Sequence, residues 1–320
     1  MARRTVSELI AERMWPGAAV ERSILGTDDP EEIWRLALAV CPDAVDCFAF
    51  EVSVGALFGL LLRDGSRVAL KIHPERDAGS LEAVQRVQAH LLEGGFPCPR
   101  PLGVHGRASL ERWCDEGSYR DAHEPAVRRV VAEHLALLIR LTRKLHPLAG
   151  LEPYFQPPDA PLWSIPHNVL FDFEATAAGA EWIDDIARAA KPVRNARVGE
   201  LVIGHGDWTV NHFRFRGLRP TVVYDWSSLG TDYETTYVGV AASGFTYTAH
   251  LPVPLWPTVD EACAFFEDYE RARGRPFSVE ERRAAHAAAV YAHAYGARCT
   301  HAVGKDARET RLEDYAAAFL

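Results

Sequence analysis

The chain has 320 residues, 48% of them hydrophobic and 25% charged, which is typical of a globular protein with about two domains or lobes. Its 35 Lys and Arg against 44 Asp and Glu give a net charge of −9, so we expect no nucleic-acid partner. No uncharged apolar run approaches the roughly 18 residues of a membrane helix, and we expect no membrane partner. The six cysteines contain no C-x-x-C pair, which indicates free thiols and a cytoplasmic location.

The first part of the chain predicts a helix followed by an antiparallel meander. Asp29-Pro30 predicts a helix start, because an N-cap carboxylate and a proline at the first helical position are typical there. Residues 47–72 then form short apolar runs separated by turns. Between two of these runs stands Asp64-Gly65, a strong hairpin signal. The meander ends in a strand that carries Lys71.

Another helix and a further strand complete a first lobe. Ser80 is predicted to cap the helix, and Gly94-Gly95 to end it. The proline-rich stretch 97–101 forces an extended backbone, and residues 104–113 predict a strand after it. The first lobe is therefore expected to span residues 1–112 and to mix helix with strand.

The second lobe, residues 113–320, is expected to be mainly helical. Apolar residues at helical spacing predict one long helix over 125–145, which a His-Pro step ends. The alanine-rich stretch 284–297 predicts another packed helix. Two short apolar strands, 201–205 and 221–225, interrupt the helical pattern.

Each of these two strands leads into a carboxylate. Asp207 follows the first, and Asp225 ends the second 18 residues later. Phosphoryl transfer needs one carboxylate to accept the proton of the attacking hydroxyl and another to hold the metal beside the phosphate. Lys71, one of only four lysines, would supply a cation for nucleotide phosphates. Its expected partner is Glu82 on the next helix, with Glu75 as the alternative.

The segment His205-Gly206-Asp207, with Asp225-Trp226 downstream, resembles the catalytic loop and metal aspartate of the aminoglycoside phosphotransferase and choline kinase family. The strand lysine and the C-terminal segment extend the resemblance over most of the chain. It implies an α+β, two-lobed, protein-kinase-like fold. Residues 1–112, a small antiparallel β-sheet with a helix and an N-terminal helical extension, would bind nucleotide. Residues 113–320, larger and mainly α-helical, would hold the catalytic and substrate-binding residues.

The resemblance also implies roles for individual residues. Asp207 would be the catalytic base, and Asp225 a magnesium ligand. Lys71 would bind nucleotide phosphate, with Glu82 as its partner. The adenine-binding hinge would be the backbone of Glu111, Arg112 and Trp113.

This sequence departs from the family pattern at the metal site. The family has an Asn five residues after the catalytic aspartate as second metal ligand, whereas here that position is His212 and Asn211 precedes it. We favour His212, because it keeps the spacing, with Asn211 as the alternative. The further acidic residue that many relatives carry after Asp225 is also missing, and Asp232 or Glu234 would have to replace it. The hairpin expected over the phosphates has no G-x-G-x-x-G.

The leading hypothesis is an ATP-dependent kinase that transfers the γ-phosphate to a hydroxyl of a small polar molecule, such as an aminoglycoside-like antibiotic. ATP and Mg²⁺ are the expected cofactors, with Mn²⁺ as the alternative metal. One alternative is a metabolite kinase that acts on choline, a sugar or an amino-acid alcohol. Two further ones are a pseudokinase-like binding module and a hydrolase whose metal is bound by His205, Asp207, His212 and Asp225. The sequence does not determine the oligomeric state.

Overall fold

The computed structural model describes residues 4–74, 76–155 and 160–320. The chain divides into two compact units. The first unit comprises Met1–Ala89, Pro99–Cys114 and Pro166–Phe171. The second comprises His90–Cys98, Asp115–Ile165 and Asp172–Leu320. The boundary predicted at residue 112 falls inside the second segment of the first unit, and the chain passes between the units several times.

The first unit contains a five-stranded antiparallel sheet of order β1-β2-β3-β5-β4. Its strands are β1 (Ala44–Val52), β2 (Ala56–Leu62), β3 (Arg67–Ile72), β4 (Pro101–His105) and β5 (Ala108–Arg112). The predicted meander is confirmed, with Gly65 at φ 83° in the turn between β2 and β3. The single strand predicted over 104–113 is wrong. Gly106, at φ 59°, turns the chain there, and β4 and β5 form a hairpin.

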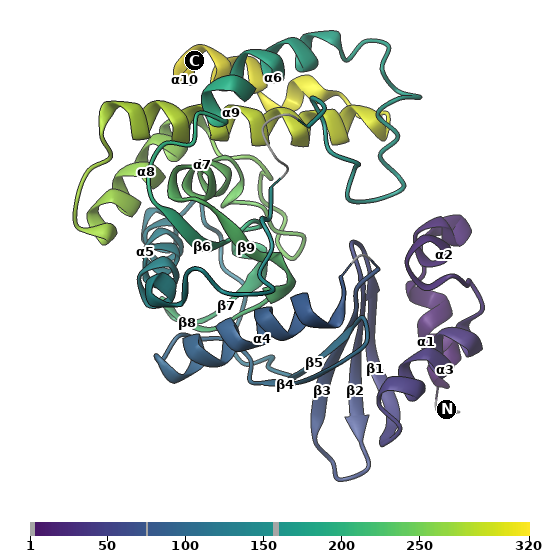
Figure 1. Ribbon diagram of the computed structural model, residues 1–320. Coiled ribbons are helices and arrows are strands. Elements are labelled where there is room, and N and C mark those ends of the chain that lie inside the picture. The colour runs from purple at the N-terminus through teal and green to yellow at the C-terminus, as the bar shows by residue number, and fades with distance from the viewer. Residues whose placement is uncertain (1–3, 75, 156–159) are drawn as a thin grey trace. The chain divides into compact units, whose positions relative to one another are not determined.

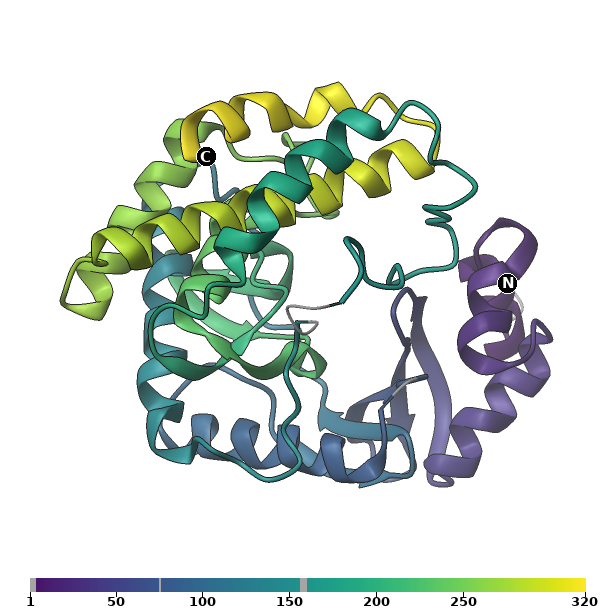
Figure 2. The same ribbon diagram turned by 45° about the horizontal axis from the view of Figure 1, so that its top comes forward.

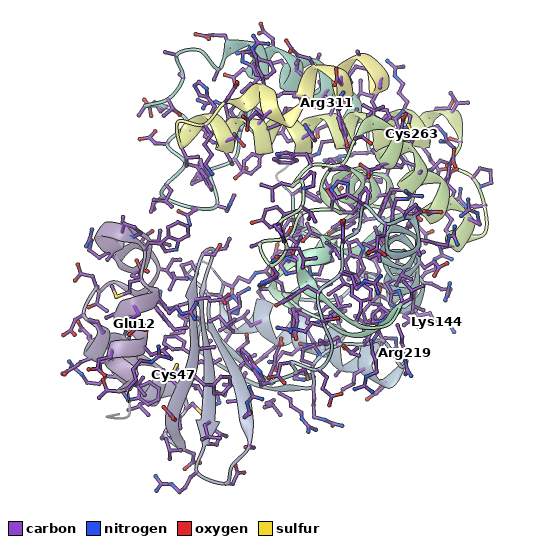
Figure 3. The ribbon with its side chains drawn as sticks, turned by 180° about the vertical axis from the view of Figure 1, so that it is seen from behind. Glu12, Cys47, Lys144, Arg219, Cys263 and Arg311 are labelled. Carbon is purple, nitrogen blue, oxygen red and sulfur yellow. The ribbon has the colours of Figure 1, made fainter. Side chains whose placement is uncertain are left out.

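Three N-terminal helices cover one face of this sheet (Figure 1). They are α1 (Val6–Arg13), α2 (Ala19–Leu25) and α3 (Pro30–Val40). The predicted start of α3 is confirmed, because the Asp29 side chain accepts the N–H of Glu31 at 2.9 Å. Figure 3 labels Glu12 of α1 and Cys47 of β1, which mark the helical and the strand layer. Cys47 is buried in the apolar core between these layers.

Helix α4 (Ala78–Glu93) runs on the other side of the sheet (Figure 1). Its predicted cap at Ser80 is wrong. The Oδ1 atom of Asp77 accepts the N–H of Ser80 at 2.7 Å, so the helix begins earlier and Ser80 lies within its first turn. Gln85 ties α4 to the sheet, since its Nε2 donates to the carbonyl oxygens of Gly103 and Leu110.

A short segment from far along the chain completes the first unit. Residues 166–171 follow α5 (Pro125–Thr142) in sequence, yet they pack with the sheet. Asn168 donates from Nδ2 to the carbonyl oxygen of Ser53 at 3.1 Å, in the turn between β1 and β2. Leu170 packs against the apolar core. This placement has no local signal in the sequence.

The second unit is mainly helical, as predicted. Besides α5, its helices are α6 (Glu181–Arg194), α7 (Glu234–Gly244), α8 (Val259–Arg273), α9 (Val279–Ala302) and α10 (Leu312–Phe319). The long helix predicted over 125–145 is α5 followed by a 3-10 turn, and the alanine-rich stretch forms α9. The small alanine side chains let α6 and α7 pack closely on α9, and Figure 2 shows α6 and α9 side by side. None of the helices described is long and apolar enough to cross a membrane.

Two small antiparallel sheets lie in the second unit. The predicted strands are present as β6 (Leu201–His205) and β8 (Arg219–Val223). Each pairs with a strand that was not predicted: β6 with β9 (Leu229–Tyr233), and β8 with β7 (Phe213–Arg216). The two sheets are linked in the chain by the short segment 206–212 between β6 and β7.

Acid should destabilise this fold through its buried histidines. His293 on α9 is fully buried and its Nε2 hydrogen-bonds to the carbonyl oxygen of Thr310. Burial lowers its pKa to about 4. In the unfolded chain this histidine takes up a proton near pH 6.5, whereas in the folded chain it does so only near pH 4. The fold therefore keeps its full stability above pH 6.5 and loses stability as the pH falls toward 4. We expect His293 to account for about 3 kcal/mol of the fall in the free energy of unfolding, measured in urea.

A neutral replacement separates this effect from general acid sensitivity. His293→Asn should lower stability at pH 7 but reduce the slope of stability against pH between 6.5 and 4. His105→Gln, at an exposed position on β4, is the matched control and should keep the wild-type slope. An unchanged slope in His293→Asn would show that His293 is not the group that titrates.

Candidate active site

The end of β6 and the loop after it pack against aromatic rings. A Cβ atom at Gly204 would lie 2.4 Å from Cδ2 of Tyr237, and one at Gly206 would lie 1.9 Å from Cε1 of Tyr154. Both positions therefore require glycine. The N–H of Gly206 also donates to the carbonyl oxygen of Ser228 at 2.8 Å. These contacts fix the backbone from which the Asp207 side chain projects.

His205 braces this loop from inside. It is 1% exposed, and its Nδ1 accepts the N–H of Asp207 at 3.3 Å. Burial, together with the charge of nearby His212, lowers the pKa of His205 to about 4. The ring is therefore neutral near pH 7. It takes no part in the cluster of possible metal ligands, so the four-ligand set of the hydrolase hypothesis is not assembled among the residues described.

Asp207, His212 and Asp225 converge at one point. Each offers a ligand atom, and these atoms all lie within 4.8 Å of one another. Asp207 follows β6, His212 ends the 3-10 turn Val210–His212, and Asp225 follows β8. The hydrogen bond from the N–H of Tyr224 to the carbonyl oxygen of His212 holds two of these segments together at 2.9 Å. Two carboxylates and an imidazole form a donor set that suits a divalent cation.

The backbone at Asp225 adopts an unusual conformation. Its φ of 62° lies in the left-handed region, which Asp tolerates better than most residues. Two hydroxyls orient its carboxylate: Ser227 donates to Oδ1 at 3.0 Å and Ser228 to Oδ2 at 2.8 Å. Ser227 and Ser228 stand where many relatives carry a further acidic residue. Here their hydroxyls position the Asp225 carboxylate.

Asp207 is held differently. Its Oδ2 lies 2.9 Å from Nε2 of His212, and 48% of its side chain is exposed. Crowding by surrounding atoms raises the pKa of Asp207, but the charge and hydrogen bond of His212 outweigh this, and the net pKa is lowered. Asp207 therefore stays ionised near neutral pH, with part of its surface open to a reactant.

Asn211 bonds to the backbone of the segment 247–249. Its Oδ1 accepts the N–H of Ala249 at 2.9 Å, and its own N–H donates to the carbonyl oxygen of Tyr247 at 3.0 Å. The structure thus places His212 beside Asp207 and Asp225, and it ties Asn211 to the segment 247–249. Which of the two binds a metal stays a prediction.

The two suggested replacements for a further acidic ligand lie outside the cluster. Glu234 is 1% exposed and bonds to the hydroxyl of Tyr269 and the guanidinium of Arg273, which makes it part of the packing between α7 and α8. Asp232 accepts the N–H of Tyr233 at 2.6 Å. Among the residues described, neither joins the three ligand residues.

Lys71 lies in the first unit, next to the last residue of β3. A Cβ atom at Gly55 would lie 3.5 Å from Cε of Lys71 and 2.6 Å from the carbonyl oxygen of Ile72. The lysine stem therefore passes close to the turn between β1 and β2, which was expected to cover phosphates. Glu82 is exposed on α4, and its pairing with Lys71 stays a prediction. Glu75 lies outside the described residues.

The predicted hinge residues Glu111, Arg112 and Trp113 lie at the end of β5. The N–H of Trp113 donates to the carbonyl oxygen of Arg67 at 3.0 Å. The Trp113 ring packs edge-on against Phe48, with 4.9 Å between centroids, and the Arg67 guanidinium lies over both rings. The hinge backbone is thus firmly held, and adenine binding there stays a prediction.

The small antiparallel sheet, the helical second unit and the carboxylate cluster after β6 and β8 define a protein-kinase-like α+β fold. The sequence matches the profile of the Phosphotransferase enzyme family over residues 52–277, and the chain belongs to that family. A search of curated proteins finds no match.

Solved structures share the fold at low sequence identity. An amicoumacin kinase, hAmiN, in complex with AMP-PNP, Ca²⁺ and Ami is 10% identical, with a TM-score of 0.59 over 90% of this chain and 95% of that chain. A choline/ethanolamine kinase family protein from Mesorhizobium loti is 16% identical, with a TM-score of 0.55 over 90% and 98%. The macrolide 2'-phosphotransferase MphH from Brachybacterium faecium is 16% identical, with a TM-score of 0.53 over 89% and 97%.

These findings confirm the resemblance and the fold class predicted from the sequence. The protein is a phosphotransferase that acts on hydroxyl groups of small molecules.

Proposed function

We propose that the protein transfers the γ-phosphate of ATP to a hydroxyl of a small polar molecule, assisted by a divalent cation. The convergence of Asp207, His212 and Asp225 in a chain of the phosphotransferase family carries this proposal. The AMP-PNP and Ca²⁺ bound by the amicoumacin kinase support an ATP-type donor and a divalent cation here too.

The two carboxylates have different roles in the proposal. Asp207 is ionised and partly exposed, so it can accept a hydrogen bond from the acceptor hydroxyl and then its proton. Asp225, oriented by two serine hydroxyls, would hold the cation together with His212. A cation there would neutralise charge on the transferring phosphate. Lys71, in the first unit, would bind nucleotide phosphate.

The imidazole in this donor set should change the metal preference. Mg²⁺ favours oxygen ligands, whereas Mn²⁺ accepts imidazole more readily. We expect Mn²⁺ to support transfer at least as well as Mg²⁺ in the wild type, and His212→Asn to shift the preference toward Mg²⁺ without abolishing activity. Initial rates at matched concentrations of each ion measure the shift.

Asn211→Ala is the control for this experiment. Because Asn211 bonds to the backbone of Ala249, its removal should leave the ratio of Mn²⁺ to Mg²⁺ rates unchanged. If the ratio responds to Asn211→Ala and not to His212→Asn, the assignment of His212 is wrong. If neither variant moves the ratio, the second ligand lies elsewhere.

The acceptor is a separate question from the reaction. Similarity to an antibiotic kinase, a macrolide phosphotransferase and a choline/ethanolamine kinase family protein supports both an aminoglycoside-like antibiotic and a metabolite such as choline. A panel of aminoglycosides, choline, sugars and amino-acid alcohols with coupled ADP detection tests the proposal. ADP release that depends on acceptor and disappears in Asp207→Asn supports it. Nucleotide binding without any transfer would favour the pseudokinase-like module, and phosphate-ester hydrolysis without nucleotide would favour the hydrolase.

A further inference from the structure

Tyr247 differs from the other tyrosines of the chain. All ten tyrosines lie in the described part of the chain, and Tyr247 is the most exposed of them, at 42%. The buried hydroxyls of Tyr269 and Tyr315 donate to protein acceptors. The Tyr247 hydroxyl, in contrast, has no hydrogen-bond partner among the residues that the structure describes. It is therefore free to bind a ligand.

The segment around Tyr247 is tied to the catalytic loop by three hydrogen bonds. The N–H of Val210 donates to the carbonyl oxygen of Phe245 at 2.9 Å, and the N–H of Asn211 donates to that of Tyr247 at 3.0 Å. The Oδ1 atom of Asn211 accepts the N–H of Ala249 at 2.9 Å. These bonds fix the segment beside the loop that carries the proposed base.

The neighbours of Tyr247 in the chain are anchored inside the protein. Thr246 and Thr248 are buried, at 0% and 1% exposure. The hydroxyl of Thr246 donates to the carbonyl oxygen of Leu255 at 2.9 Å. The hydroxyl of Thr248 accepts the N–H of His250 at 3.2 Å. Because both neighbours are held, the backbone presents the Tyr247 side chain at the surface in a fixed position.

The Tyr247 phenol lies near the Asp207 carboxylate, and both belong to the second unit. Burial of part of the ring raises the pKa of Tyr247, and the charge of Asp207 contributes in the same direction. Between partly exposed groups such an effect is short-ranged, because water and salt screen the charges. The Asp207 side chain is also 48% exposed. A molecule bound at Asp207 would therefore meet the Tyr247 phenol.

We propose that Tyr247 determines acceptor specificity: its phenol hydroxyl binds a second hydroxyl of the molecule whose first hydroxyl is deprotonated by Asp207. This inference rests on the proposed function and narrows its substrate class. A phenol both donates and accepts a hydrogen bond, as an alcohol does. The segment 247–250 contains no Asp, Glu, Lys or Arg, so it offers the acceptor a neutral surface with aromatic and hydroxyl groups. Acceptors with two neighbouring hydroxyls should be preferred over those with one, such as choline.

Matched acceptors test this proposal. The panel pairs glycerol with 1,3-propanediol, 3-amino-1,2-propanediol with 3-amino-1-propanol, and sugars with their deoxy counterparts. In each pair the second member lacks one hydroxyl beside the hydroxyl to be phosphorylated. We expect the first member of the best pair to exceed the second about 3- to 10-fold in kcat/KM, the net contribution of one hydrogen bond. The difference should appear in KM, because the bond is present in both the ground state and the transition state.

Variants locate the effect at the Tyr247 hydroxyl. Tyr247→Phe keeps the exposed ring, and we expect its stability to be close to that of the wild type. It should lower kcat/KM for the better acceptor to that of its counterpart and leave the counterpart unchanged, whereas loss of a merely structural group would lower both alike. Tyr233→Phe is the matched control and should keep the full discrimination. Tyr233 pairs with Leu201, at the opposite end of β6 from His205.

Two results with these variants would overturn the inference. One is unchanged discrimination in Tyr247→Phe. The other is discrimination that Tyr247→Phe keeps and Tyr247→Leu loses, because the acceptor would then contact the ring and not the hydroxyl.

Calorimetric binding of the same pairs without nucleotide separates this inference from the proposed function. Binding that prefers the additional hydroxyl in the wild type, and loses this preference in Tyr247→Phe, supports the inference even if no acceptor is phosphorylated. Transfer without any preference for the second hydroxyl overturns the inference and leaves the phosphotransferase intact. The absence of both transfer and binding that depends on Tyr247 would overturn both.

Discussion

Replacing Asp207 with Asn should lower turnover by about 10²- to 10⁴-fold, the range typical of losing a general base. The amide has nearly the shape of the carboxylate and can still accept a hydrogen bond from Nε2 of His212, at the position where Oδ2 lies 2.9 Å away. The loop should therefore keep its conformation, and nucleotide affinity should be close to that of the wild type. Single-turnover ADP formation and nucleotide titration measure the two quantities.

The control for this variant is Asp314→Asn, an equal change at an exposed position on α10. It should leave both quantities unchanged. Near-wild-type turnover in Asp207→Asn would remove Asp207 from the mechanism. A loss of nucleotide affinity as large as the loss of turnover would instead assign Asp207 to metal binding.

Replacing Asp225 with Asn should weaken metal-dependent nucleotide binding as well as turnover. The substitution removes the charge of a proposed ligand but suits the fold, since Asn also tolerates the left-handed backbone found at φ 62°. Loss of an outer-shell partner alone typically costs 10- to 100-fold in metal affinity, so loss of a ligand charge should cost at least about that much. Nucleotide titrations over a series of Mg²⁺ and Mn²⁺ concentrations measure the effect.

Ser228→Ala is a milder variant to compare with Asp225→Asn. It removes the hydroxyl that orients Oδ2 of Asp225 and keeps the charge, so its effect should be in the same direction but smaller. Equal metal dependence in Asp225→Asn and the wild type would contradict the assignment of Asp225 as the metal carboxylate.

Much of the architecture was predictable because its signals are local. The Asp64-Gly65 turn, the Asp29 cap and the apolar spacing of α5 each involve a few neighbouring residues, and the structure confirms all three. Errors occurred where two neighbouring signals compete. Ser80 is a good cap, but Asp77 precedes it and accepts its N–H, so the helix begins earlier.

The candidate site was predictable in part. Asp207 and Asp225 stand out because each follows a short apolar strand, and the structure brings them together with His212. The two serines that orient Asp225 gave no signal, because their role depends on a tight turn after β8. β9, the partner of β6, was missed because a short strand is defined by its partner more than by its own residues.

By itself, the sequence determined helices α3, α4, α5 and α9, the meander of the first unit and the two carboxylates that follow β6 and β8, because turns, caps and apolar spacing act over a few consecutive residues. Only the tertiary structure decided which side chains meet across long separations. It turned Asn211 toward Ala249 and left His212 beside Asp207. It also buried the Arg194 guanidinium against the rings of Phe155 and Tyr291, which come from two distant segments. Such choices depend on the packing of whole elements against one another, which no local pattern encodes.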